Sequence, residues 1–591
     1  MRAIVAIPQG FLVSCKTSLM ATTSTSPRKR TGKKKRPDQP AATQPRKASK
    51  RAVFLQPIVR VLRPETRTGR RTLIGILVTA FLLRAFRLMD LFPILVDESI
   101  YLHWAEIIEH QGQWFISLWD GKQPLQYWVL AVVRMIFGGD PLLEGRFVAV
   151  CVGLLSTIGV FGVGKRLGGD LAGLISAGLY AIFPLALLYD RLAYTESFVN
   201  LCGIAIVLTS LYAFGDGKSW KPEIAAGLAV GLALFTKQTA LLFVYFPVLA
   251  ALWLGRGKKR NLFARLAVIY AITGIFLGVL WLGQPQGPTL ETHDAVFHHK
   301  EFYVSPDKLL EDPTTMWPKN FNLLQGYVGT YLTWPAAFVG LLCLAYLTWR
   351  RSLAPWVLLS ICIPPLVLQA TILSLMFPTR WAFPHMWPVL AVIGMAAADA
   401  WKEYGPRLDA TQLRLTMGVA VVLVAGPMLY QAQGMLLSTR DYLHAGDAEN
   451  FMGSHAHVGT GNREAIEYFI AEARRGGPLT LLTDPIWGPP ADSMFPYLNH
   501  RYGMRVYEAW WMQLSGRHAI LPQGPADIMK SQYERVKAGV IDFSKLSRVF
   551  YVTDTFHSPK AEVRIRQPSA KLIQSFSKHD GRHSIDIYRL K

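Results

Sequence analysis

The sequence predicts an α-helical polytopic membrane protein with a small α/β domain at its carboxyl end. Of its 591 residues, 51% are hydrophobic and 17% are charged, whereas soluble domains carry about 25% charged residues. The mean hydropathy is +0.23, and many apolar runs approach the roughly 20 residues that cross a bilayer as a helix. This composition excludes an ordinary soluble enzyme and a chain that is disordered throughout.

The amino-terminal region 1–71 carries much of the positive charge. The formal net charge is +23, and residues 21–71 contain 16 Lys and Arg against two acidic residues. Such a segment is expected to be disordered, and ahead of a membrane helix it sets topology and attracts anionic lipid. We therefore favour a cytoplasmic tail over a nucleic-acid arm and expect no nucleic-acid partner. The first 20 residues are interpreted either as a weak interfacial segment or as lying upstream of a true start at Met20 rather than Met1.

About eleven membrane spans are predicted within residues 72–432. Most are continuous apolar runs, but the long run 223–254 is divided into two short spans by Thr236, Lys237 and Gln238. The predicted spans are 72–90, 147–165, 171–189, 197–214, 223–236, 239–254, 262–282, 326–348, 353–376, 382–400 and 414–432.

The short apolar stretch 124–138, which contains Arg134, decides the topology. If it does not cross the membrane and the amino terminus is cytoplasmic, the basic loops fall inside, as the positive-inside rule requires. Those loops contain Lys165 and Arg166, Lys218 and Lys221, Arg256 and Lys258 to Arg260, Arg350 and Arg351, and Lys402 and Arg407. We therefore predict an amphipathic helix in the outer interface of a multi-pass protein of the cell (plasma) membrane.

Residues 433–591 are more polar and are predicted to form an extracytoplasmic α/β domain. Short β-like runs alternate there with helical stretches. The runs are 479–483, 549–553 and 585–588, and the helical stretches are 463–475 and 525–537. The domain contains no cysteine, so its stability depends on its own apolar core.

Ionisable residues near the ends of the apolar runs are the candidate site, because such residues are costly at membrane depth. On the predicted topology they all lie on the outer side. They are Asp97, Glu98, Tyr101, Lys122, Arg191, Glu196, Lys237 and Arg380. Taken alone, Asp97 and Glu98 are explained better by capping of a helix start. Taken together, the four cations would form a pocket suited to a phosphate or pyrophosphate.

Six short motifs in the region 72–432 resemble those of the GT-C class of polytopic glycosyltransferases, of the aminoarabinose transferase and protein O-mannosyltransferase type. In chain order they are Asp97-Glu98 with Tyr101, Lys122-Gln123-Pro124-Leu125 with Tyr127-Trp128, Gly145-Arg146-Phe147, Arg191 with Glu196, the run 231–237 ending in Lys237, and Arg380-Trp381. Each motif alone has low specificity. Their shared order and predicted side make the resemblance fairly specific.

The resemblance implies an inverting transfer of a sugar from a polyprenyl-phosphate donor to a lipid, glycan or protein acceptor at the outer leaflet. Asp97 would be the general base that takes the proton of the acceptor hydroxyl, with Glu98 the next carboxylate in line. Lys122 and Arg380 would stabilise the leaving phosphate. The partners implied are the donor, the acceptor and membrane lipids.

A cofactor is not settled by the sequence, and a divalent metal stays open. The second motif has Gly121 where many relatives have Glu, which removes one carboxylate from any metal site there. The outer loop contains His293, Asp294, His298 and His299. Because His298 and His299 are adjacent, they cannot share a helix face, so solvated loop side chains are favoured over a metal site.

A transporter or lipid-linked sugar flippase without transferase activity is the alternative hypothesis. Such proteins commonly contain inverted repeats, whereas no second copy of the 97–128 pattern is present. A receptor whose outer domain acts alone is a third hypothesis, but it leaves Asp97 and Lys122 without a role.

Overall fold

The fold is described by a computed structural model in which most of the chain after residue 60 can be placed. The described residues are 61–591 without 216–219, 256–258, 284–302, 375–376, 456–457, 485–487, 509–513, 516–517, 521–539, 543–545, 558–559, 561–562 and 565–566. The predictions for the tail up to residue 60, for the four polar residues of the outer loop and for the helix 525–537 lie outside them.

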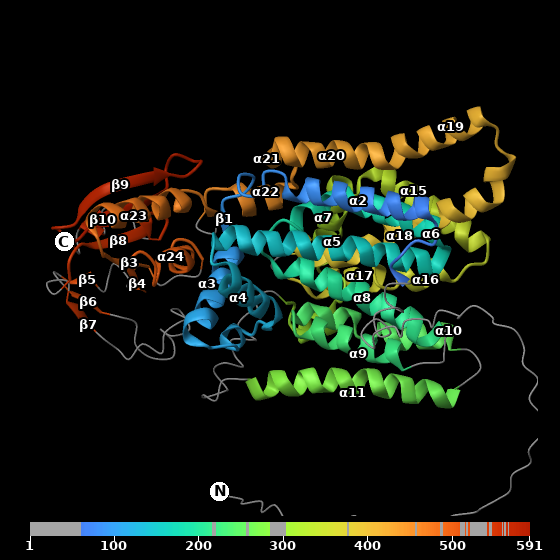
Figure 1. Ribbon diagram of the computed structural model, residues 1–591, viewed down its shortest axis with the longest axis horizontal. Coiled ribbons are helices and arrows are strands. Elements are labelled where there is room, and N and C mark those ends of the chain that lie inside the picture. Colours follow the sequence, from blue (N-terminus) through green and yellow to red (C-terminus); the bar gives the residue numbers. More distant parts are fainter. Residues whose placement is uncertain are drawn as a thin grey trace, which may run out of the picture. The chain divides into compact units, whose positions relative to one another are not determined.

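A bundle of apolar helices forms the first part of the described chain (Figure 1). Among the described residues, six helices are long and apolar enough to cross a membrane, and a bent pair makes a seventh if it counts as one span. They are Pro141–Gly168 (α5), Thr195–Phe214 (within α8), Asn261–Gly283 (within α11), Ala354–Ile372 (α16 and α17), Thr379–Arg407 (α18 with a short extension) and Ala410–Leu437 (α19 to α20). The bent pair is Trp317–Leu332 (α14 and η4) and Trp334–Trp349 (α15), which meet at 97°.

Other predicted spans occur as shorter or broken helices, so the number eleven stays a prediction. The segment predicted at 171–189 is divided by Pro184, which lacks an amide N–H and disfavours helix in the residue before it. The predicted break after residue 235 is seen between α9 and η2. These elements are α2 (Arg67–Ala85), α6 (Asp170–Ala181), α7 (Pro184–Tyr189), α9 (Lys221–Leu234), η2 (Gln238–Phe243) and α10 (Phe246–Leu254).

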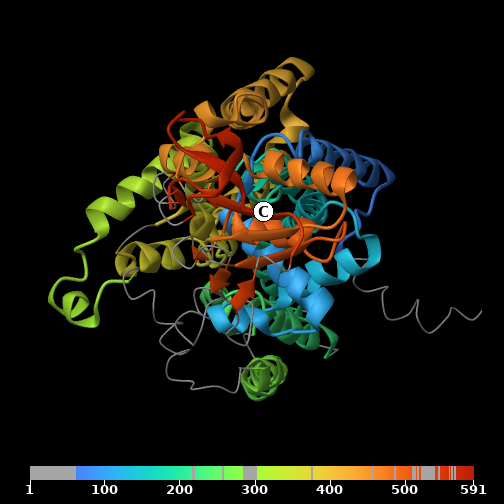
Figure 2. The same ribbon diagram turned by 90° about the vertical axis from the view of Figure 1, so that its left-hand side faces the viewer.

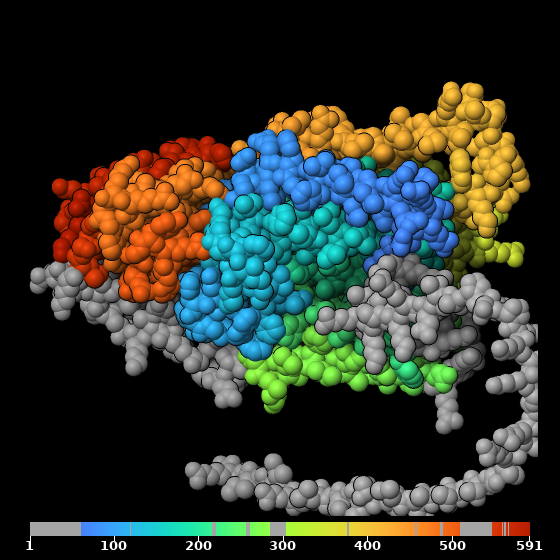
Figure 3. Space-filling model, in the orientation of Figure 1, coloured from blue at the N-terminus to red at the C-terminus, as the bar shows by residue number. Residues whose placement is uncertain are grey.

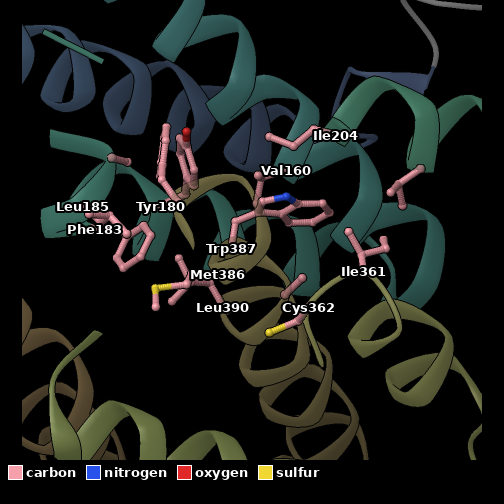
Figure 4. Packing of buried hydrophobic residues seen from close by; sticks show 14 of the residues in the cluster. Val160, Tyr180, Phe183, Leu185, Ile204, Ile361, Cys362, Met386, Trp387 and Leu390 are labelled. Atoms are coloured by element: carbon pink, nitrogen blue, oxygen red, sulfur yellow. The ribbon is translucent and has the colours of Figure 1, made fainter. Parts of the chain in front are cut away.

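Large apolar side chains and close backbone contacts hold the bundle together. Trp387 of α18 is fully buried, and Figure 4 shows it among side chains of α5 and α8 that include Val160 and Ile204. Where α5 meets α6, a Cβ on Gly164 would stand 2.9 Å from the Cα of Gly173. Small residues of this kind let membrane helices approach closely.

The chain between α2 and α5 forms a compact segment at one end of the bundle, which we call the α3–α4 segment. It consists of β1 (Ile94–Leu95), α3 (Val96–Gln111), η1 (Ile116–Asp120) and α4 (Leu125–Phe137). With 13 residues, α4 is about 20 Å long, shorter than the roughly 30 Å hydrocarbon core. This length supports the proposal that α4 lies in the interface.

The last part of the chain contains a five-stranded mixed sheet in the order β4-β3-β8-β10-β9, seen in front of the bundle in Figure 2. β3 (Thr480–Thr483), β8 (Val549–Asp554) and β10 (Ser584–Arg589) coincide with the three predicted runs. β4 (Arg505–Glu508) and β9 (Lys571–Ser577) were not predicted. They are the edge strands, and β9 is largely exposed, so neither carries a strong apolar pattern. The same part of the chain contains the helices α23 (Asn462–Gly476) and α24 (Ala491–Leu498), whose apolar residues share a buried cluster with those of the sheet.

The α3–α4 segment and this sheet domain share one apolar core. Trp104 and Ile107 of α3 belong to the same buried cluster as Phe469 and Phe495 of the sheet domain. β1 also pairs with β2 (Val458–Gly459), and in Figure 3 the blue surface of the α3–α4 segment adjoins the orange surface of the domain. The start of α3 is therefore held between the bundle and the sheet domain.

Candidate active site

Asp97 and Glu98 lie in the first turn of α3, and their side chains have different surroundings. Glu98 is fully buried, and its two oxygens accept hydrogen bonds from Arg146 at 2.9 and 2.7 Å. The same carboxylate accepts from the backbone N–H of Ala193 at 2.9 Å and of Leu95 at 3.3 Å. Glu98 thus fixes the entry into α3 to both α5 and the turn before α8.

Asp97 faces a cluster of cations and retains some contact with solvent. Its carboxylate accepts a hydrogen bond from Nη1 of Arg380 and lies 3.9 Å from Nζ of Lys122, and its side chain is 13% exposed. Burial by itself would raise the pKa of Asp97, but Arg380, Lys122 and Lys237 outweigh burial and lower that pKa to about 2. The carboxylate is therefore ionised at neutral pH.

The ammonium group of Lys122 lies over two aromatic rings. Its ammonium lies 5.3 Å from the ring centre of Tyr101 and 5.2 Å from that of Trp104, within cation–π range. It also pairs with Asp120 at 3.0 Å. Burial opposes its charge, but Asp120 and Asp97 raise the pKa of Lys122 above its ordinary value. The predicted binding residue Tyr101 thus belongs to the same cluster.

Glu196 and Lys237 form the next side of the site. Glu196 lies in the first turn of α8, and Lys237 lies at the break between α9 and η2, where its backbone is extended. The two side chains make an ion pair, and Lys237 contributes to the low pKa of Asp97. The interruption of an apolar run at Lys237 therefore places a cation at the site.

Arg191 lies apart from this group. It donates to the backbone carbonyl of Phe86, and the charges that act on it are Arg146, Arg84 and Arg87. Its neighbour Asp190 makes a fully buried ion pair with Arg84 at 3.0 Å. Three of the four predicted cations, without Arg191, thus gather around Asp97.

A buried carboxylate behind Arg380 was missed by sequence reasoning. Asp447 of α22 (Ala445–Met452) accepts hydrogen bonds from the hydroxyl of Thr379 at 2.6 Å and from that of Tyr331 at 2.5 Å. Thr379 also bonds the hydroxyl of Tyr189 at 2.7 Å. Asp447 therefore anchors the turn that presents Arg380. A single acid beyond the last apolar run gives no signal of this contact.

Within the described part of the chain, no group of three or more His, Cys, Asp or Glu side chains could hold a metal ion. The four polar loop residues for which a metal was weighed, His293, Asp294, His298 and His299, fall in the undescribed range 284–302. A divalent metal as cofactor therefore stays a prediction from the sequence.

Comparisons with known proteins agree on one class. The family model described as dolichyl-phosphate-mannose-protein mannosyltransferase matches residues 121–282. Lipid A galacturonosyltransferase RgtD of Rhizobium johnstonii is 22% identical over 496 residues, 83% of this chain and 91% of that protein. ArnT from Cupriavidus metallidurans, solved bound to undecaprenyl phosphate, has a TM-score of 0.59 at 16% identity, covering 89% of this chain and 99% of that chain. AglB from Archaeoglobus fulgidus, solved with an inhibitory peptide and a dolichol-phosphate, has a TM-score of 0.50 at 12% identity. The match covers 88% of this chain and 74% of that chain.

The fold, the charged site and these matches define a polytopic membrane glycosyltransferase of the GT-C class. Within that class the chain shares the fold of ArnT and matches the protein O-mannosyltransferase model over residues 121–282. The resemblance predicted from the six motifs is confirmed.

Proposed function

We propose that the chain moves a sugar from a polyprenyl-phosphate donor to a hydroxyl group of a lipid, glycan or protein acceptor on the extracytoplasmic face, with inversion at the anomeric carbon. The observation that carries the proposal is the partly exposed Asp97 among Lys122, Lys237 and Arg380. One carboxylate can accept the acceptor proton while the cations hold the departing phosphate.

Asp97 and the donor phosphate compete for the same cations. A carboxylate with a pKa of about 2 is a weak base, because general bases work best with a pKa near the working pH. When the donor phosphate draws Arg380 and Lys122 toward itself, the charges that depress the pKa of Asp97 are shared with the phosphate. Donor binding therefore raises the basicity of Asp97 at the step in which it is needed.

Glu98 acts in this proposal as a positioning residue. Its fully buried carboxylate is bonded to Arg146 on two atoms, which fixes the first turn of α3 and the direction of Asp97. Lys237 and Glu196 hold the far side of the phosphate site as a pair. Tyr101 supports the ammonium of Lys122.

A transfer assay tests the chemistry. Purified full-length protein would be supplied with a panel of polyprenyl-phosphate sugars and a mixed lipid and glycan acceptor fraction. We expect one donor to be consumed, polyprenyl phosphate to be released, and the new bond to have the anomeric configuration opposite to that of the donor. Retention of configuration would contradict direct displacement. Movement of an intact donor across the membrane without any new glycosidic bond would favour the flippase hypothesis.

The orientation in the membrane is tested separately. Cysteines introduced at the exposed positions Lys402 and Arg582 should react with an impermeant thiol reagent from opposite sides, position 402 from the cytoplasm and position 582 from outside. Reaction of both from one side would contradict the proposed placement of the sheet domain.

A further inference from the structure

A hollow at the far end of α3 lies between that helix and the sheet domain. It has a volume of about 170 Å³. For comparison, an engineered apolar cavity of about 150 Å³ binds benzene. The space therefore admits one six-membered ring. Its lining includes His103, Glu106 and Gln111 of α3 and Phe495 and Asn499 of the sheet domain.

Glu106 is a carboxyl group with one bonded oxygen and one unbonded oxygen. Its side chain is 1% exposed, and Oε1 accepts a hydrogen bond from Asn499 at 3.2 Å. Among the described residues Oε2 has no hydrogen-bond partner. A buried polar atom without a partner costs roughly 1–3 kcal/mol. A molecule bound in the hollow would supply the missing hydrogen-bond partner of this oxygen.

The remaining lining is polar but contains flat apolar faces. The imidazole of His103 bonds Asp492 at 2.8 Å and stacks on the ring of Phe495 at 4.1 Å, so both rings are fixed. Gln111 stands at the exposed end of α3. Burial raises the pKa of Glu106 to about 8, which keeps its carboxyl group protonated at neutral pH. Carboxyl and carboxamide groups both donate and accept hydrogen bonds.

We propose that this hollow binds a single sugar ring and forms a carbohydrate site separate from the centre at Asp97. Hydroxyl groups each donate and accept, which matches the carboxyl group of Glu106 and the carboxamide of Gln111. Asn499 bonds both Glu106 and the backbone N–H of Val506 and thereby orients that carboxyl group. An apolar guest would leave Oε2 of Glu106 without a partner, and the described residues contain no three-ligand cluster for a metal.

The carbohydrate site, defined as the hollow lined by these residues of α3 and the sheet domain, does not overlap with the proposed transfer chemistry. Glu106 is nine residues beyond Asp97 on one helix, a distance of about 14 Å at 1.5 Å per residue. The inference therefore does not rest on the transferase reaction, and it is tested by binding alone.

The test is saturation-transfer NMR on the full-length protein in detergent with free mannose, galactose and glucuronate as probes. Tetrahydropyran-2-methanol, a ring of the same size with one hydroxyl group, is the negative probe. We expect at least one sugar, and not the negative probe, to receive saturation. Equal signals from the negative probe, or no signal from any sugar, would overturn the proposal and leave a water-filled hollow.

Two variants and a matched control locate the binding. Gln111→Trp fills the mouth from an exposed position without changing the core, and Glu106→Leu keeps the volume while removing the carboxyl group. Both should abolish the sugar signal, whereas Arg582→Trp, at an exposed position between β9 and β10 on the opposite side of the sheet from β4, should leave it intact. A signal that survives Gln111→Trp would mean that the sugar binds elsewhere and would overturn the assignment.

Discussion

Asp97 and Glu98 are adjacent carboxylates with opposite surroundings. Glu98 has no exposed surface and is bonded to one arginine on both oxygens, whereas Asp97 is partly exposed and is shared among several cations. Successive residues of a helix point about 100° apart, because each turn contains 3.6 residues. One side chain thus enters the packed bundle, and its neighbour faces the space where substrates are expected to bind.

This difference separates stability from chemistry. A buried pair contributes little relative to an apolar replacement, but removal of one partner leaves an unpaired charge in a low-dielectric interior. A partly exposed cluster tolerates the loss of one member, because water and the other cations compensate. Changes at the Glu98–Arg146 pair should therefore affect folding, and changes at the Asp97 cluster should affect transfer.

The largest effect on folding is expected for Arg146→Ala. It leaves the Glu98 carboxylate buried without its partner, which typically costs about 3–5 kcal/mol. Thermal unfolding in detergent should show a strongly lowered Tm, and Glu98→Gln in the same chain should restore part of it. An unchanged Tm for Arg146→Ala would contradict the structural role of the pair.

A smaller effect, on donor binding, is expected for Arg380→Ala. Loss of a charge-assisted hydrogen bond is worth about 1.5–3 kcal/mol, or roughly a tenfold to hundredfold weaker donor affinity, with little change in Tm. Arg380→Lys should recover the affinity only in part, because a point charge does not replace the planar fork. Wild-type donor affinity in the alanine variant, measured by titration with donor, would remove Arg380 from the phosphate site.

Asp447→Asn should weaken the site indirectly. Asparagine preserves the size and can accept one hydroxyl hydrogen bond, but it does not satisfy Thr379 and Tyr331 equally, so a loss of about 1 kcal/mol is expected. Because Thr379 precedes Arg380, the KM for donor should rise more than kcat falls. Thr379→Val, which removes the same hydrogen bond from the other side, should reproduce this pattern. If kcat and Tm both fall while the KM for donor stays unchanged, the role of Asp447 is purely structural.

The smallest effect is a displacement of the acid limb of the pH profile. The lowered pKa of Asp97 means that its contribution to stability is present above its ordinary value of 3.8 and is lost as pH falls toward 2. In kcat/KM, which reports the free enzyme, Asp97 should produce no acid limb near neutrality. In kcat the limb should lie at higher pH, because bound donor phosphate shares the cations. Coincident limbs would contradict the competition between Asp97 and the phosphate.

The sequence predicted the parts of this molecule that have local signals. Apolar runs located the bundle, alternating runs located β3, β8 and β10, and the interruption at Lys237 marked a cation that the fold brings to Asp97. The resemblance assigned the base to Asp97, but the residues alone could not distinguish Asp97 from Glu98. Both lie in the same first helical turn, and their surroundings depend on Arg380 and Arg146, 283 and 48 residues away.

Long-range contacts account for the other differences. Arg191 follows Asp190 in a motif that predicts a site residue, but the pairing of Asp190 with Arg84 belongs to the bundle interior. Asp447 becomes part of the site region only because the chain returns from the last long helix to Thr379. Neither contact has a pattern that can be recognised along the sequence.

The most direct test of the account compares Asp97→Asn with Glu98→Gln in transfer rate per folded molecule. Asp97→Asn should bind donor and keep its Tm, but lose about 10²–10⁴-fold in rate, as removal of a general base does. Glu98→Gln should lower the Tm and leave the rate of the folded fraction within about tenfold of wild type. If Asp97→Asn retains more than about a tenth of the wild-type rate, Asp97 only pairs with the surrounding cations and the base lies elsewhere.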